Sequence, residues 1–157
     1  MIRLNELVSE AITDFGKVVA LANGEFLVDS MTIEIAAKPH KAPTALPADK
    51  IAVYAFFLNG QALKVGKVGP KSAARYTSQH YNPAGAGSTL ARSILANAAK
   101  VGAFGVDNGS VGGWIRKNTD RVNLLLPRSF GLAILSLLES FLHVRWKPLF
   151  EGRAESD

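Results

Sequence analysis

Tyr54 and Lys64 are the first pair of residues in this sequence whose types and spacing could support chemistry. They stand ten positions apart, on either side of Asn59-Gly60, a dipeptide typical of tight hairpin turns. A phenol beside an ammonium can lose or relay a proton, because the positive charge lowers the phenol pKa. Tyr54 is therefore a candidate general base, and Lys64 a residue that tunes it or contacts a phosphate. The alternatives are a core tyrosine with a partnered hydroxyl and a solvent-facing strand lysine.

Glu139 stands out because its surroundings in the sequence are almost entirely apolar. The segment reads Leu132-Ala-Ile-Leu-Ser-Leu-Leu-Glu139-Ser-Phe-Leu142, so a helix here carries apolar residues nearly all round. A carboxylate in such a helix is costly unless it is paired or bound to a metal. With water and phosphate completing the shell, Glu139 would suit Mg²⁺ or Mn²⁺ as the sole protein ligand. The alternative is a salt bridge to Arg75 or Lys64.

Arg75 has the side chain best suited to stabilise charge on a phosphate in a transition state. A guanidinium forks two hydrogen bonds onto two oxygens, although a surface arginine is the alternative. Other cations and rings are candidates for nucleic-acid contacts: Lys67, Lys71, His80, Tyr81, Arg116 and Lys117. Trp114 could stack on a base or belong to the core.

The elements that must position these residues begin with a β-hairpin. Two β-rich runs, 51–58 and 62–68, flank the Asn59-Gly60 turn. Pro70 suits the first turn of a helix through Ser72, Arg75 and Ser78. A long helix over 131–145, ended by Pro148, carries Glu139.

The remaining pattern completes an α/β chain with a small, mainly antiparallel three-stranded sheet flanked by helices. Before the hairpin, we expect a helix over 4–15 ended by Gly16, a strand or irregular hairpin over 26–36 and an extended arm over 37–49. After it, we expect a loop over 82–87, a helix over 89–100 capped by Ser88 and a mobile glycine-rich loop over 101–113. A helical turn over 114–119 and a buried strand over 122–126 follow. Residues 1–50 are predicted as an N-terminal extension, 51–151 as the main domain and 152–157 as a tail.

Charge in this chain is distributed unevenly. The net charge is +5 over 157 residues, and the 57 residues from Lys50 to Val106 contain seven cations and no acid. Such a stretch should create a positive field that attracts a polyanion such as nucleic acid. There is no cysteine and no apolar leader or membrane-length segment, so we expect a soluble, cytoplasmic protein without membrane contact.

Four motifs resemble those of the GIY-YIG nuclease superfamily, in the same order along residues 51–151. Ala52-Val53-Tyr54 resembles the first triplet, and Lys64-Val65-Gly66-Lys67 resembles the second triplet and its following lysine. Arg75 matches the superfamily's arginine. Leu138-Glu139 with Lys147-Pro148 resembles its glutamate helix.

The resemblance implies a metal-dependent endonuclease that hydrolyses phosphodiester bonds in DNA, with RNA not excluded. It implies Tyr54, Lys64, Arg75 and Glu139 as catalytic residues and Glu139 as the ligand of Mg²⁺ or Mn²⁺. Lys64 replaces the second tyrosine, a variant similar to some restriction-type members, and Ala52 replaces a glycine. The asparagine often found beyond the Lys-Pro pair is absent, because the chain reads Leu149-Phe150-Glu151.

Two other functions are compatible with the same residues. One is a non-catalytic nucleic-acid-binding module that keeps the basic face. The other is a protein-interaction module in which the N-terminal helix docks on a partner. Substrate specificity would come from the first 50 residues, the glycine-rich loop or assembly into a homodimer.

Overall fold

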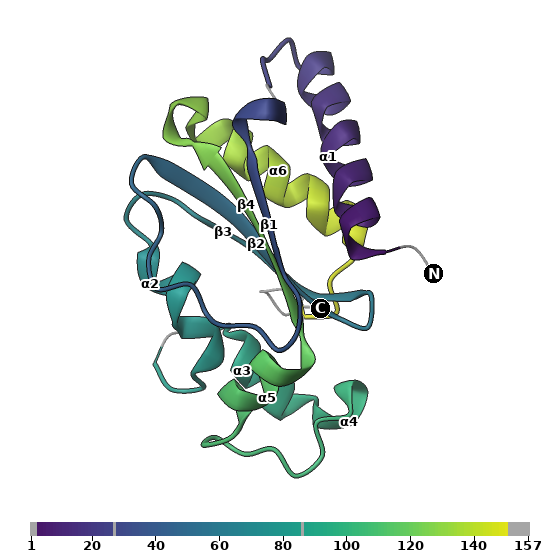
Figure 1. Cartoon of the computed structure of the whole chain (residues 1–157), viewed down its shortest axis with the longest axis vertical. Helices are drawn as coiled ribbons and strands as arrows, with labels where there is room; N and C mark the ends of the chain where they lie inside the picture. Colours follow the sequence, from purple (N-terminus) through teal and green to yellow (C-terminus); the bar gives the residue numbers. More distant parts are fainter. Residues whose placement is uncertain (1–2, 27, 86, 151–157) are drawn as a thin grey trace, which may run out of the picture.

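The computed structural model describes residues 3–26, 28–85 and 87–150, and its centre is one four-stranded antiparallel sheet (Figure 1). The strands are β1 (Thr32–Ala36), β2 (Lys50–Leu58), β3 (Gln61–Val68) and β4 (Asp120–Pro127), in the order β1-β4-β2-β3. The predicted α/β class is confirmed, but the predicted number of three strands is wrong. The fourth strand, β1, lies in the segment expected as an extension and pairs with β4, Glu34 opposite Asn123.

The predicted hairpin is confirmed as β2 and β3. Asn59 and Gly60 both have positive φ angles, 50° and 85°, as a tight hairpin turn requires. The register places Tyr54 opposite Gly66 and Lys64 opposite Phe56, with an irregularity between Phe56 and Phe57. Both strands are nearly covered on both faces, which explains why their sequences are apolar almost throughout.

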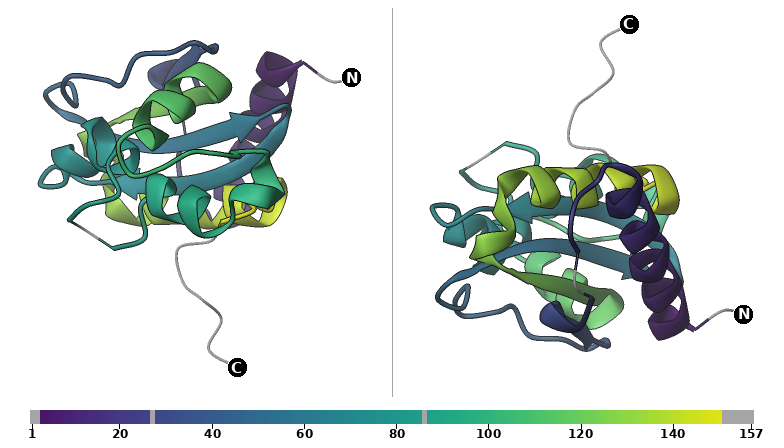
Figure 2. Two further views of the ribbon diagram at one scale, coloured as in Figure 1. Left: turned by 90° about the horizontal axis from the view of Figure 1, so that it is seen from below. Right: turned by 90° about the horizontal axis from the view of Figure 1, so that it is seen from above.

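Helices α1 (Leu4–Leu21) and α6 (Gly131–Trp146) cover one face of the sheet (Figures 1 and 2). The buried face of α1 consists of Val8, Ala11, Ile12, Phe15 and Val19, and it joins the same core cluster as Leu135, Leu138 and Leu142 of α6. The prediction that the first helix ends at Gly16 is therefore wrong, and the helix continues to Leu21. It continues because Val19 adds another core contact, which offsets the modest cost of a glycine inside a helix.

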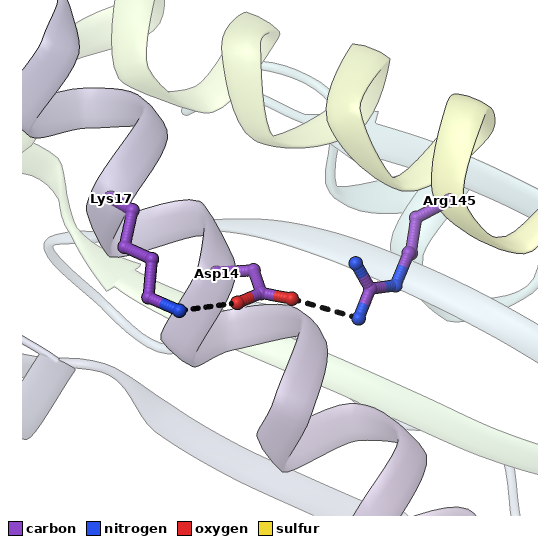
Figure 3. A network of polar contacts seen from close by, with 3 residues as sticks. All are labelled: Asp14, Lys17 and Arg145. Carbon is purple, nitrogen blue, oxygen red and sulfur yellow. Dashed lines mark hydrogen bonds and ion pairs between the residues drawn. The ribbon is translucent and has the colours of Figure 1, made fainter.

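A charged contact also joins α1 to α6 at their surface (Figure 3). Asp14 accepts from Lys17 Nζ at 2.9 Å and from Arg145 Nη2 at 2.9 Å. The two cations hold the pKa of the Asp14 carboxyl below its usual value through these hydrogen bonds. Because all three groups are partly exposed, the contact orients the helices more than it stabilises them.

Short helices cover the opposite face of the sheet (Figure 2). They are α2 (Ala73–Thr77), α3 (Leu90–Ala96), α4 (Ala98–Val101) and α5 (Val111–Asn118), with the 3₁₀ turn η2 (Gln79–Tyr81). The 3₁₀ turns η1 (Val28–Ser30) and η3 (Arg128–Phe130) instead contact α1 and α6. The helix expected over 89–100 is two helices, and Thr89, not Ser88, caps the first by accepting from Arg92 N. The loop expected over 101–113 ends at α5, where Val111 is fully buried.

The segment before the hairpin is integrated with the rest of the protein. His40 N donates to Arg116 O at 2.9 Å, and Lys38 N donates to the Asp120 carboxylate at 2.8 Å. After α6, Lys147 takes a left-handed conformation, and Leu149 N and Phe150 N donate to Ala62 O and Leu63 O of β3. The predicted tail, 152–157, lies outside the described residues. Among the residues that are described, no helix is long and apolar enough to cross a membrane.

Candidate functional site

Tyr54 is enclosed at the middle of β2, above a glycine of the neighbouring strand. A Cβ atom placed on Gly66 would lie 2.3 Å from Tyr54 Oη and 2.5 Å from Cζ, so the ring occupies the space that a side chain would need. The Tyr54 side chain is fully buried. Burial raises the pKa of its phenol to about 12, while the charges of Arg75 and Arg121 act to lower it.

Lys64 lies diagonally beside Tyr54 on the same face of the hairpin, opposite Phe56. It is 3% exposed, and among the described residues its ammonium has no hydrogen-bond or ion-pair partner. Burial, and then the positive charge of Arg75, lowers the pKa of Lys64 to about 8. The predicted alternative of a solvent-facing lysine does not describe this side chain. An almost covered, unpaired cation beside a phenol is suited to receive an anion.

His80, in η2, forms the direct contact to Tyr54. Its Nε2 lies 2.6 Å from Tyr54 Oη, and its Nδ1 accepts from Leu90 N at 3.1 Å. Because a backbone N–H can only donate, Nδ1 must be unprotonated, and the neutral ring therefore carries its proton on Nε2. His80 thus donates to Tyr54 Oη. Burial, assisted by the nearby charges of Lys64, Arg75 and Arg121, lowers the pKa of His80 to about 3.

Arg75, on α2, brings a third positive charge to this cluster. Its side chain is partly exposed, and its charge lowers the pKa values of Tyr54, Lys64 and His80. An arginine that acts on all three neighbours must lie among them. The structure therefore brings Tyr54, Lys64 and Arg75 near one another from β2, β3 and α2, and their catalytic roles stay a prediction.

Glu139 approaches the cluster from α6, on the other side of β3. Its carboxylate accepts from Lys67 Nζ at 3.0 Å, and the two side chains are 22% and 41% exposed. Its negative charge acts to raise the phenol pKa of Tyr54, although α6 covers the opposite face of the sheet from the Tyr54 ring. The sequence suggested Arg75 or Lys64 as the alternative ion-pair partner, but the partner is Lys67. Lys67 projects from the α6 face of β3, on the side of Val65, and for this reason it reaches Glu139.

Some of the residues expected to contact nucleic acid are exposed, and others are buried. Lys71, Arg116 and Lys117 are exposed. His80 and Tyr81 are 1% and 6% exposed, so their side chains point into the protein and are not available for direct contacts with nucleic acid. Arg116 lies over the Tyr81 ring, 4.7 Å from its centroid. Trp114 packs against the core cluster on this face, as its structural alternative held.

Sequence reasoning missed a buried polar network next to Tyr54. Arg121 of β4 is 1% exposed and donates to Tyr81 Oη at 3.0 Å, and His40 Nε2 lies 2.9 Å from the same oxygen. The signal was present in the sequence, because Arg121 immediately precedes an apolar strand, as Glu139 interrupts an apolar helix. The strand was expected to begin at Val122 and thus left Arg121 outside.

The donor set offers one carboxylate for a metal ion. Among the described residues, no group of three or more His, Cys, Asp or Glu side chains could hold an ion. Glu139 alone, partly exposed and beside the cationic cluster, fits Mg²⁺, which retains several waters and is often bound through one or two carboxylates. Such an ion would have to displace Lys67 from the carboxylate.

A hollow opens beside the start of α2. It has a volume of about 320 Å³ and is lined by Leu46, Pro47, Ala48, Asp49, Lys50, Pro70, Ala73 and Arg128. Its lining holds two cations, Lys50, which belongs to the acid-free stretch, and Arg128, and one acid, Asp49. The hollow therefore carries a small positive charge, of the sign that attracts a polyanion.

Comparison with known proteins gives no relative for this chain. No protein-family model, no curated protein and no solved structure matches it. A function for this chain can therefore be inferred only from its own residues and their geometry.

Proposed function

We propose that this protein is a metal-dependent phosphodiesterase that cleaves DNA, with Tyr54, Lys64, Arg75 and Glu139 as its catalytic residues. The observation that carries the proposal is the convergence of a phenol, an unpaired buried lysine, an arginine and a carboxylate from four separate elements. This is the set that the resemblance to GIY-YIG nucleases implied, and the acid-free stretch supplies the surrounding positive field.

The chemistry assigned to each side chain follows from its position. Ionised Tyr54 takes a proton from the water that attacks phosphorus, and the 3′-oxygen leaves from the opposite side. Lys64 and Arg75 contact the non-bridging oxygens and stabilise the negative charge that develops on them. His80 donates to Tyr54 Oη and therefore stabilises the phenolate. Glu139 would hold Mg²⁺ or Mn²⁺, which supplies Lewis-acid stabilisation of the phosphate and of the leaving oxygen.

The buried state of Tyr54 sets a condition on this mechanism. Its side chain has no exposure, so water and phosphate must reach its hydroxyl by a movement of a neighbouring side chain. Arg75 acts on Tyr54 and is partly exposed, and a phosphate that draws its guanidinium outward would open this path.

A cleavage assay tests the proposal directly. Supercoiled, linear, branched and single-stranded DNA would be incubated with Mg²⁺ or Mn²⁺ and wild-type, Tyr54→Phe or Glu139→Gln protein. We expect both variants to lose at least about 100-fold in rate, the typical contribution of general acid–base or charge-stabilising groups. Glu10→Gln, which removes an exposed carboxylate from α1, is the matched control. Equal cleavage by all proteins would contradict the mechanism.

The second candidate function is a nucleic-acid-binding module without catalysis. The complete burial of Tyr54 and its phenol pKa of about 12 favour this alternative. It predicts salt-dependent DNA binding without metal-dependent cleavage. The third candidate, docking of the N-terminal helix on a partner, has less support, because the apolar face of α1 is covered by the protein's own core.

A further inference from the structure

Arg121 carries a positive charge into the interior of the protein, next to the proposed site. Its side chain is 1% exposed. The guanidinium carbon lies 5.6 Å from the centroid of the Tyr54 ring, and 5.1, 5.0 and 5.9 Å from those of Phe56, Tyr76 and Tyr81. Aromatic faces attract cations, and this attraction strengthens when water is absent. Four rings on β2, α2 and η2 thus enclose one arginine from β4.

Hydrogen bonds fix the orientation of this guanidinium. Nε donates to Asn123 Oδ1 at 2.8 Å, Nη1 to Tyr81 Oη at 3.0 Å and Nη2 to the carbonyl of Tyr76 at 2.5 Å. Among the described residues, no carboxylate forms an ion pair with Arg121. The acidic group in its network, Glu34, is reached only through Asn123, whose Nδ2 donates to Glu34 Oε2 at 3.2 Å.

The proton positions at His40 and Tyr81, on the other side of this network, follow from the same donor and acceptor rules. His40 Nδ1 lies 2.7 Å from Thr119 O, which can only accept, so this nitrogen carries the proton. Nε2 therefore accepts from the Tyr81 hydroxyl, and the Tyr81 oxygen accepts from Arg121. Each proton in this series of hydrogen bonds therefore has one position. The groups that hold Arg121 cannot exchange their donor and acceptor roles.

A buried charge without a countercharge is costly, and an apolar side chain of similar size would often stabilise the fold as well or better. The charge of Arg121 is therefore better explained by its effect on its neighbours. We propose that Arg121 is a positioning residue for the Tyr54–His80 pair, whose fixed positive charge beside the Tyr54 ring favours ionised Tyr54 and disfavours protonation of His80. This inference rests on the proposed function, in which Tyr54 accepts the proton of the attacking water.

The other groups around the pair show why a fixed internal charge is useful. The charged and titratable side chains that act on Tyr54 and His80 are Lys64 from β3, Arg75 from α2, Arg121 from β4 and Glu139 from α6. Lys64 and Arg75 would engage the substrate, and Glu139 would engage the metal. Arg121 is the cation of this set that substrate does not reach, so its effect on the pKa values of Tyr54 and His80 persists when phosphate is bound.

The test combines titration with cleavage in Arg121→Met, which replaces the charge with an apolar chain of similar length. NMR of protein labelled with ¹⁵N-histidine and ¹³Cζ-tyrosine follows His80 and Tyr54 separately. Without the Arg121 charge, we expect His80 to protonate at a pH higher by on the order of one unit, and Tyr54 to ionise at a correspondingly higher pH. Cleavage near neutral pH should fall about tenfold and recover as the pH is raised.

Two further variants separate charge from packing. Arg121→Gln is a second uncharged variant, whose amide nitrogen reaches about as far as Nε and can still donate to Asn123 Oδ1, and it keeps the test available if the methionine variant does not fold. Arg121→Lys retains the charge and should keep His80 close to its wild-type titration. Arg145→Met, which removes a partly exposed arginine from α6, should change neither titration nor cleavage.

The outcomes distinguish this inference from the function beneath it. If His80 and Tyr54 titrate as in the wild type when a folded variant lacks the Arg121 charge, the positioning role is overturned. If Arg121→Lys shifts His80 as far as Arg121→Met does, charge is not the cause, and the proposal is overturned as well. Failure of the wild-type protein to cleave any DNA would instead overturn the proposed function, while the titrations would still decide the role of Arg121.

Discussion

Gly66 lies directly opposite Tyr54 across the β2–β3 hairpin, and the tyrosine ring fills the volume that a side chain at position 66 would need. This relationship gives the glycine of the second motif a steric role. It also ties the position of the proposed base to a residue that has no functional group. A change at Gly66 should therefore act on chemistry by displacing Tyr54.

Gly66→Ala tests this relationship. Its methyl group would lie within 2.5 Å of Tyr54 Oη and Cζ, so the ring must leave the position in which it contacts His80. We expect DNA cleavage to fall by at least about 100-fold, as for loss of the base itself, and stability to fall by about 1–3 kcal/mol from overpacking. Gly113→Ala is the matched control, because a Cβ there meets no atom within 4 Å. Unchanged cleavage in a folded Gly66→Ala protein would contradict the assigned role of Tyr54.

The ion pair between Lys67 and Glu139 leads to a prediction about metal binding. Lys67→Met should tighten binding of Mn²⁺ by up to about fivefold, because a partly exposed ion pair that competes with the metal is worth at most about 1 kcal/mol. Calorimetric titration of DNA-free protein would measure this affinity. Lys71→Met removes an equivalent charge without freeing a carboxylate and should leave the affinity unchanged. Weaker binding in Lys67→Met would show that Glu139 is not the metal ligand.

The hairpin and the glutamate helix could be predicted from sequence because local rules dominate there. Asn59-Gly60 fits only a few turn conformations, and Lys147 ends α6 just before Pro148. A strand was expected within 26–36, but its place as the fourth strand of the sheet could not be predicted, because Thr32–Ala36 has only five residues and is exposed along most of its length. Its place in the sheet depends on its pairing with β4, which lies about 90 residues further along the chain.

The candidate site, like the fold, could be predicted from the sequence only in part. Residue types and motif order were sufficient to bring Tyr54, Lys64 and Arg75 to one place. The roles of His80 and Arg121 depend on burial and hydrogen-bond direction, which the sequence does not contain. His80 had been expected at the nucleic-acid surface, but η2 turns its ring inward between Tyr54 and Leu90 N.

His80 should make the protein sensitive to mild acid. Burial lowers its pKa to about 3 in the folded state, against 6.5 when exposed, so between these values the unfolded chain binds the extra proton. Its contribution to stability is complete above about pH 6.5 and is lost as the pH falls towards 3, by at most about 1.4 kcal/mol per pH unit. Urea unfolding between pH 4 and 7 would measure the slope. His80→Gln, whose amide nitrogen can donate to Tyr54 as Nε2 does and which does not titrate, should show a shallower slope, and parallel curves would exclude His80 as the cause.

Lys64 should make DNA binding depend on pH between 7 and 9, a range in which most lysines stay charged. Its pKa of about 8 means that the free protein loses this charge as the pH rises from 7 to 9, so affinity for DNA should fall over this range. Between pH 7 and 9, the slope of log affinity against log salt should become shallower by about one, the value expected for one phosphate contact.

Lys64→Arg, which stays charged at both pH values, should keep tight binding and the steeper slope at pH 9, whereas Lys64→Gln should show the weaker binding at both. Fluorescence anisotropy with a labelled duplex measures all three proteins. If the wild type binds DNA equally at pH 7 and 9 with the same salt slope, Lys64 does not contact phosphate, and its buried charge needs another explanation.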